Sequence, residues 1–143
     1  MSSAELDNLV RAGKLKREQP SRKELETLRG SGERRLGDAE RNDLSFDSRF
    51  DLAYNAAHAL GLFALRRMGY RSDNRYLVFQ TLPHTAGMPA ATWRVLAKAH
   101  ERRNTAEYEG RLEHDERLLA DLLNAARALR EAVGRMPLPD EPR

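Results

Sequence analysis

The stretch from Phe46 to Met68 constrains the fold more than any other part of the 143-residue chain. Its apolar side chains recur at steps of three and four, which predicts an α-helix. They are Phe46, Phe50, Ala53, Ala57, Leu60, Ala64 and Met68. Further apolar residues cover its other sides, and a helix that is apolar nearly all round is usually central and buried. The rest of the chain is therefore expected to pack around this helix.

Helical patterns also occur on both sides of this stretch. We expect helices over about residues 4–12, 21–41, 73–82, 89–108 and 112–133. Gly30-Ser31-Gly32 is expected to bend or break the second of them, because glycine costs about 1 kcal/mol within a helix. Valine and threonine are few and isoleucine is absent, so strand patterns are almost lacking. The sequence predicts an all-α, up-and-down bundle of four to five main helices with a short N-terminal helical extension.

This pattern divides the chain into three parts. Residues 1–20 form the N-terminal extension and residues 21–135 form the helical bundle. Residues 136–143 hold three prolines and are expected to be a disordered tail.

Several classes of protein are disfavoured by composition. The chain has no cysteine, which excludes a disulfide scaffold and a cysteine nucleophile. Its four histidines include no helical pair at a spacing of four, and no glycine-rich phosphate loop is present, so no metal or cofactor is expected. No apolar run is long enough to span a bilayer and the N-terminus is not a signal peptide, so we expect a cytoplasmic protein without a membrane partner. The formal net charge of +3 is too small to argue for nucleic-acid binding by itself.

Two polar stripes interrupt otherwise apolar helix faces. On the helix over residues 89–108 the apolar stripe changes to His100, Asn104 and Glu107, flanked by Arg103 and Tyr108. Either this end of the helix is simply solvated, or the polar groups serve a purpose. On the central helix the second stripe consists of Asp51, Asn55 and His58. These groups either hydrogen-bond one another and nearby backbone, or line a groove shared with Arg103.

The same two regions carry a resemblance to a known family. Two segments of the chain carry it. The first is the segment from Phe50 to Leu60, followed by Gly69-Tyr70-Arg71, which looks like the central helix of that family. The second is Arg102-Arg103-Asn104-Thr105-Ala106-Glu107-Tyr108, which looks like the signature segment of that family. Both resemble the HEPN family (higher eukaryotes and prokaryotes nucleotide-binding). The family signature is an arginine, usually followed by a polar residue such as asparagine, with a histidine several residues later. The resemblance covers roughly residues 21–133, helix for helix.

The resemblance implies a helical bundle that pairs as a homodimer, with the two signature segments facing each other across the two-fold axis. In active members this arrangement is a metal-independent endoribonuclease, in which the arginine holds the scissile phosphate and the histidine takes part in cleavage. Other members lack catalysis and pair with a nucleotidyltransferase, often within toxin–antitoxin or stress-response operons. By position, Arg103 matches the phosphate-binding arginine and Asn104 matches the polar residue beside it. A guanidinium suits a phosphate because its donors match the phosphate oxygens.

The sequence departs from the signature at the histidine, whose window falls on residues 108–110. Tyr108 occupies the earliest position of that window, and a tyrosine with a pKa of about 10 is a poor general base. It can still donate a hydrogen bond to phosphate or stack on a base. His100, one turn before Arg103, and His114 are spatial alternatives outside the motif, and His58 and His84 have no motif support. The candidate catalytic residues are thus Arg103 and Tyr108.

The candidate binding residues share the two polar stripes; they are Asn104, His100, Glu107, Asp51, Asn55 and His58. Three functions follow from these residues. The first is a HEPN-type homodimer whose groove around Arg103 binds RNA, a nucleotide or a partner protein such as a nucleotidyltransferase or an antitoxin. The second is an endoribonuclease with an altered active site. The third is a structural interaction module in which Arg103 and Glu107 form an ordinary surface ion pair.

Overall fold

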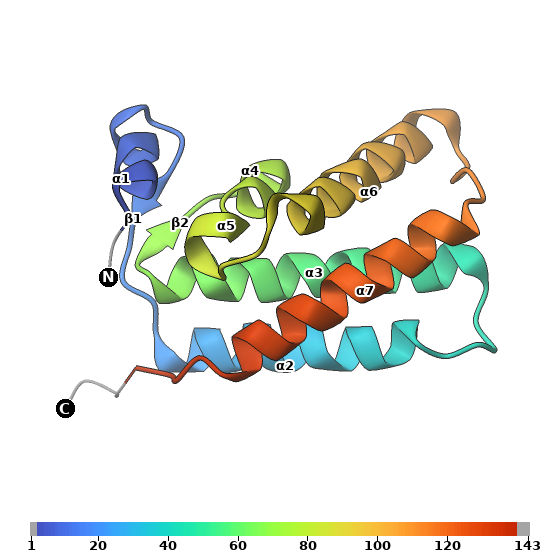
Figure 1. Ribbon diagram of the computed structural model, residues 1–143, viewed down its shortest axis with the longest axis horizontal. Coiled ribbons are helices and arrows are strands. Elements are labelled where there is room, and N and C mark those ends of the chain that lie inside the picture. The colour runs from blue at the N-terminus through green and yellow to red at the C-terminus, as the bar shows by residue number, and fades with distance from the viewer. Residues whose placement is uncertain (1–2, 140–143) are drawn as a thin grey trace.

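The computed structural model describes residues 3–139 of the chain. Within this range the chain forms seven helices and two short strands (Figure 1). The helices are α1 (Ala4–Arg11), α2 (Arg22–Ala39), α3 (Phe46–Arg67), α4 (Arg75–Gln80), α5 (Leu82–Thr85), α6 (Ala90–Glu109) and α7 (Glu116–Gly134). The strands β1 (Lys16–Arg17) and β2 (Tyr70–Arg71) pair antiparallel, with Lys16 opposite Arg71. The predicted all-α helical bundle is confirmed.

The central helix is α3, as its apolar pattern predicts. Twelve of its residues are buried, because α2 lies along one side of it, α7 crosses it, and α4 and α6 cover the remaining side (Figure 1). Ser45 caps its first turn by accepting a hydrogen bond from the Ser48 amide. Each helix within residues 3–139 is too short or too polar to span a lipid bilayer.

The glycines of α2 do not bend or break that helix, contrary to the expectation. The helix is continuous from Arg22 to Ala39. Gly32 is buried against α3, and a Cβ atom placed on it would lie 2.6 Å from Cγ of Leu60. The missing side chain therefore lets α2 approach α3 closely, and this packing offsets the low helix propensity of glycine.

Two other helix boundaries differ from the predicted ones. The segment over residues 73–82 is split, since α4 ends at Gln80 and α5 begins at Leu82. The last helix begins at Glu116 rather than at residue 112, because Asp115 is its N-cap and accepts the Leu118 amide.

The N-terminal extension is attached to the bundle by a second, smaller apolar cluster. Leu6 and Leu15 pack in it against Leu65, Tyr70 and Val78 of the bundle. Tyr70 also donates a hydrogen bond from its hydroxyl to Asp7, at 2.5 Å.

Arg66 joins the extension, α2 and β2 at one point. Its side chain is only 3% exposed. It donates two hydrogen bonds to the carboxylate of Glu24, at 2.7 and 3.1 Å. It also donates to the backbone carbonyls of Glu18, Gln19 and Tyr70. A buried guanidinium is tolerated here because acceptors surround it.

The first part of the predicted disordered tail lies against the bundle. Met136 and Leu138 pack on the main core. Three arginines of α2 and α3 donate to tail carbonyls: Arg29 to Met136, Arg67 to Pro137 and Arg22 to Pro139. Proline supplies carbonyl acceptors without needing a partner for an N–H group, so such a segment docks readily beside arginines. Residues 140–143 lie outside the described range.

Candidate functional site

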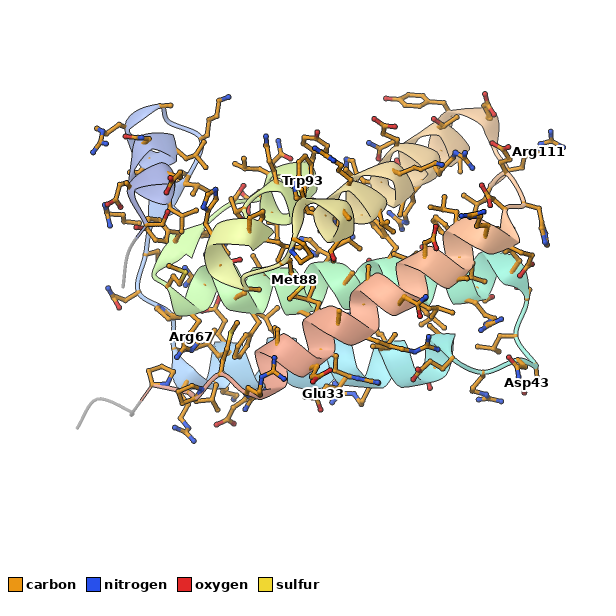
Figure 2. The ribbon with its side chains drawn as sticks, in the orientation of Figure 1. Glu33, Asp43, Arg67, Met88, Trp93 and Arg111 are labelled. Atoms are coloured by element: carbon orange, nitrogen blue, oxygen red, sulfur yellow. The ribbon has the colours of Figure 1, made fainter. Side chains whose placement is uncertain are left out.

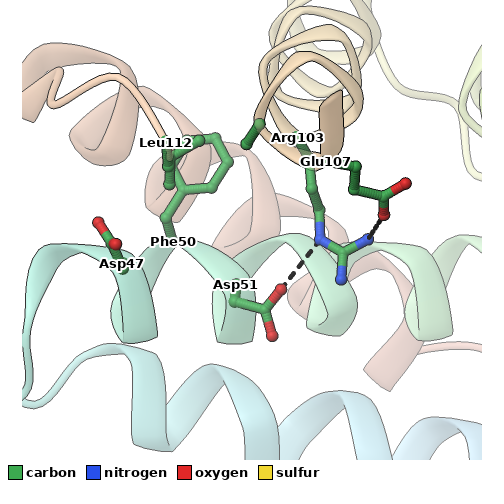
Figure 3. A pocket seen from close by; sticks show the side chains of 7 residues that line it. Asp47, Phe50, Asp51, Arg103, Glu107 and Leu112 are labelled. Atoms are coloured by element: carbon green, nitrogen blue, oxygen red, sulfur yellow. Dashed lines mark hydrogen bonds and ion pairs between the residues drawn. The ribbon is translucent and has the colours of Figure 1, made fainter. Parts of the chain in front are cut away.

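The two segments that carry the HEPN resemblance lie side by side. The beginning of α3 and the second half of α6 meet where Arg103 Nε donates a hydrogen bond to Asp51 Oδ1 at 2.9 Å (Figure 3). These residues are far apart in the sequence. Of the second stripe, Asp51 therefore lines a groove shared with Arg103, as one alternative proposed, whereas Asn55 donates to the Asp51 backbone carbonyl, as the other proposed.

Arg103 is held by three neighbours. Besides Asp51, its Nη1 lies 3.7 Å from Glu107 Oε1, one turn further along α6. Its guanidinium carbon lies 4.9 Å from the centre of the Tyr54 ring, within cation–π range. The Arg103 side chain is 31% exposed, so solvent still reaches it. Both charged partners are carboxylates, and both are more exposed than Arg103.

A chain of hydrogen bonds runs beside Arg103. Nδ2 of Asn104 lies 3.1 Å from Nε2 of His100, and Nδ1 of His100 lies 2.8 Å from the hydroxyl of Tyr54. An amide nitrogen can only donate, so Nε2 of His100 accepts and Nδ1 carries the ring proton. Burial, followed by the charge of Arg75, lowers the pKa of His100 from its ordinary value. His100 is thus neutral at neutral pH, with both nitrogens engaged.

A second arginine lies on the same tyrosine. Arg75 Nη1 donates to Asn55 Oδ1 at 2.9 Å, and its guanidinium carbon lies 5.5 Å from the centre of the Tyr54 ring. Nδ2 of Asn55 in turn donates to the Asp51 carbonyl. Tyr54 and Arg75 are not among the site residues predicted from the sequence. Tyr54 directly precedes Asn55 of the polar stripe, so its position in the sequence could have indicated a place at the site. No pattern in the sequence indicates such a place for Arg75.

His58 lies deeper in this region. Burial, and then the charge of Arg75 and that of His100 once it is protonated, lower the pKa of His58 from 6.5 to about 4. Its ring packs edge-on to Phe79. No residue of the described range forms a hydrogen bond with it. His58 is therefore a neutral packing residue, and it does not line the groove beside Arg103.

That groove has a volume of about 320 Å³. Its lining combines charged and apolar side chains from α3, α6 and the loop after α6: Asp47, Phe50, Asp51, Arg103, Ala106, Glu107 and Leu112 (Figure 3). Carboxylates outnumber the guanidinium three to one. The groove therefore presents an acidic surface with an apolar part, not a cationic one.

Tyr108 is not brought to Arg103 within one chain. It is 91% exposed and does not line the groove. The reason is helical geometry, since residues five apart on a helix point to different sides. The two candidate catalytic residues therefore do not form a joint site in the single chain.

The remaining histidines have other neighbours. His114 stacks on Phe46 and lies 2.6 Å from Glu116, and His84 lies 3.9 Å from Glu5 of α1. Neither contacts Arg103. Among residues 3–139 no group of three or more histidine, aspartate or glutamate side chains could hold a metal ion.

Comparison with known proteins adds no relative. No protein-family model matches the chain, and no curated protein or solved structure matches it either. The HEPN resemblance therefore stays a hypothesis that rests on the residues of the two segments.

Proposed function

We propose that the chain is a non-catalytic binding protein of the HEPN type, which holds a partner protein in the groove beside Arg103. The observation that carries this proposal is the position of Arg103 between two carboxylates, Asp51 and Glu107. A phosphate would have to displace both carboxylates and approach Asp47 as well. Like charges placed together oppose binding, so an RNA backbone is a poor ligand for this groove.

A protein segment with a cationic side chain beside an apolar one suits the groove better. Its cation would face the carboxylates, and its apolar side chain would contact Phe50, Ala106 and Leu112. Interfaces commonly combine an apolar centre with charged groups at the rim. The HEPN resemblance suggests a nucleotidyltransferase or an antitoxin as the source of such a segment.

The resemblance also suggests a second copy of the chain as a partner. Tyr108, the most exposed large apolar side chain of the described residues, lies near the end of α6, and Arg111 points outward from the loop that follows (Figure 2). Tyrosine and arginine are enriched in protein interfaces. Homodimerisation through this end of α6 predicts that sedimentation detects a dimer and that Tyr108→Ser shifts it toward monomer. A wild-type chain that stays monomeric at high concentration would exclude the homodimer.

Binding of labelled single-stranded RNA tests the groove itself. We expect no binding by the wild type and a gain in the double variant Asp51→Asn/Glu107→Gln, which frees Arg103. Exposed ion pairs contribute about 0.2–1 kcal/mol each, so the gain is at most roughly thirtyfold. Glu101→Gln/Glu109→Gln on the same helix is the matched control, with the same charge change outside the groove. Tight RNA binding by the wild type that Arg103→Ala abolishes would reject the proposal.

Metal-independent RNA cleavage is the second candidate, favoured by one observation. His100 and Arg103 both contact Tyr54, so a histidine does lie beside the signature arginine, although outside the motif. This function predicts RNA cleavage in EDTA that His100→Gln and Arg103→Ala both abolish. Intact RNA after long incubation at high protein concentration would exclude it.

A further inference from the structure

A second groove lies between α6 and α7. Two adjoining hollows of about 280 and 260 Å³ share Val95 and Asp121, so they form one continuous depression. It shares no lining residue with the Arg103 groove. The two helices are joined at one end by the loop after α6 (Figure 1).

Five of the twelve residues that line this α6–α7 groove are apolar, and four of these five are alanine or valine. They are Ala91 and Val95 of α6 and Leu118, Ala125 and Ala128 of α7. Along α7 the lining extends from residue 117 to residue 128, which is about 16 Å at 1.5 Å per residue. That length matches about three turns of a further helix, and small side chains allow such a helix to approach closely.

One end of the groove carries three basic side chains and two carboxylates, Asp115 and Asp121. Arg94, Lys98 and Arg117 line this end, and none of them forms an ion pair or a hydrogen bond with another side chain of residues 3–139. The acidic residue Asp115 caps α7 and accepts a hydrogen bond from Arg102. The charge of Lys98 also contributes, after these hydrogen bonds and the charge of Arg102, to the lowered pKa of Asp115. Asp121 is the remaining carboxylate of the lining. This end of the groove thus has one more basic side chain than carboxylates, and its three basic side chains form no ion pair at contact distance within the described part of the chain.

We infer that the α6–α7 groove is the docking site for an acidic amphipathic helix of a partner protein. Its apolar side chains would lie on Val95, Leu118 and Ala125, and its carboxylates would face Arg94, Lys98 and Arg117. Grooves between helices recognise amphipathic helices in this way, with apolar anchors on one face. Charge complementarity selects the partner. RNA fits less well, since no aromatic side chain lines the groove for base stacking. This inference does not depend on the function proposed for the Arg103 groove.

Selection from a display library of random peptides, each about 11 residues long to match the groove, tests the inference. With the full chain as bait, we expect the selected peptides to combine leucine-type residues at helical spacing with glutamate or aspartate. The double variant Lys98→Glu/Arg117→Glu should bind these peptides at least about tenfold more weakly and select basic peptides instead, because two attractive pairs become repulsive. The matched control is Lys23→Glu/Arg34→Glu on exposed positions of α2, which should behave like the wild type.

A second variant separates shape from charge. Ala128→Trp fills the groove from an exposed position without changing the charge of the groove. We expect it to weaken the binding of the selected peptides by a factor similar to that of the charge-reversed variant. Circular dichroism checks that each variant keeps its helices. The inference is wrong if selected peptides lack acidic residues, or if the charge-reversed protein selects the same peptides. It is equally wrong if neither variant weakens binding, or if labelled single-stranded RNA proves to be the ligand that charge reversal removes.

Discussion

Gly32 allows the packing of α2 on α3 to be tested with a single methyl group. The substitution Gly32→Ala places a Cβ atom 2.6 Å from Cγ and 2.7 Å from Cδ2 of Leu60, and 3.3 Å from the Ala56 carbonyl oxygen. Carbon atoms in ordinary contact lie about 3.5–4.0 Å apart, so Leu60 or the whole helix must move by roughly 1 Å. Leu60 is fully buried, so its movement would displace other core side chains.

The magnitude follows from two opposing effects. Overpacking a core costs about 1–3 kcal/mol, whereas replacing a helical glycine by alanine gains up to about 1 kcal/mol. Gly37 lies in the same helix, is exposed, and has no atom within 4 Å of an added Cβ. Gly37→Ala therefore gives the propensity gain alone. The difference in unfolding free energy between the two variants isolates the overpacking cost, which we expect to be about 1–3 kcal/mol.

Urea unfolding followed by far-UV circular dichroism measures this difference. We expect the midpoint of Gly37→Ala to lie above that of the wild type and the midpoint of Gly32→Ala to lie well below that of Gly37→Ala. If the unfolding free energy of both variants depends on the urea concentration with the same slope as that of the wild type, both substitutions act on the folded state. If the two variants are equally stable, α2 and α3 do not approach each other through Gly32 and the reasoning fails.

Three further predictions concern single side chains. Arg66→Met should lower the unfolding free energy by about 3–5 kcal/mol, since three backbone carbonyls lose Arg66 as a donor and the partly buried Glu24 carboxylate keeps only the Ser21 amide. A double-mutant cycle with Glu24→Gln should show strong coupling, and additive effects would contradict the shared contact. The lowered pKa of His58, about 4 against 6.5 in the unfolded chain, means that the unfolded state binds the proton first, so stability falls as the pH drops from 6.5 to 4. This loss amounts to about 2–3 kcal/mol and should largely disappear in His58→Gln, as urea midpoints at the two pH values would reveal. Asp115→Ala should lower the unfolding free energy by about 0.5–2 kcal/mol, because α7 loses its N-cap. An unchanged thermal midpoint would show that Asp115 does not stabilise the helix as a cap.

The fold could be predicted largely from local patterns. The apolar spacing of residues 46–68 predicts the central helix because period and burial are both properties of one segment. The failure at Gly30-Ser31-Gly32 has a tertiary cause, since the helix is continuous where Gly32 meets Leu60. Likewise the tail carbonyls meet arginines distant in the sequence, and no local pattern encodes such an encounter.

The candidate site could be predicted only in part. Asp51, Asn104 and His100 are in contact with the cluster around Arg103 because each lies on a helix face whose polarity is visible in the sequence. The ion pair of Arg103 with Glu107 was one of the sequence-based alternatives, since the two residues are one helical turn apart. The second ion pair, with Asp51, was not predicted, because pairing between α3 and α6 depends on how the two helices are rotated about their axes. Arg75 was missed for a similar reason, since it reaches the cluster from a short helix with no pattern of its own.

The contacts of Arg66 have a consequence for how the molecule unfolds. The Arg66 guanidinium joins residues 18–19, the first turn of α2 and the end of α3. If any one of these segments detached, the buried charge of Arg66 would lose hydrogen-bond acceptors. We expect the N-terminal extension to belong to the same cooperative unit as the bundle. Its slowly exchanging amides should then exchange at the rate of global unfolding, and a chain shortened by the first 20 residues would be a destabilised bundle with an exposed edge, not a minimal domain.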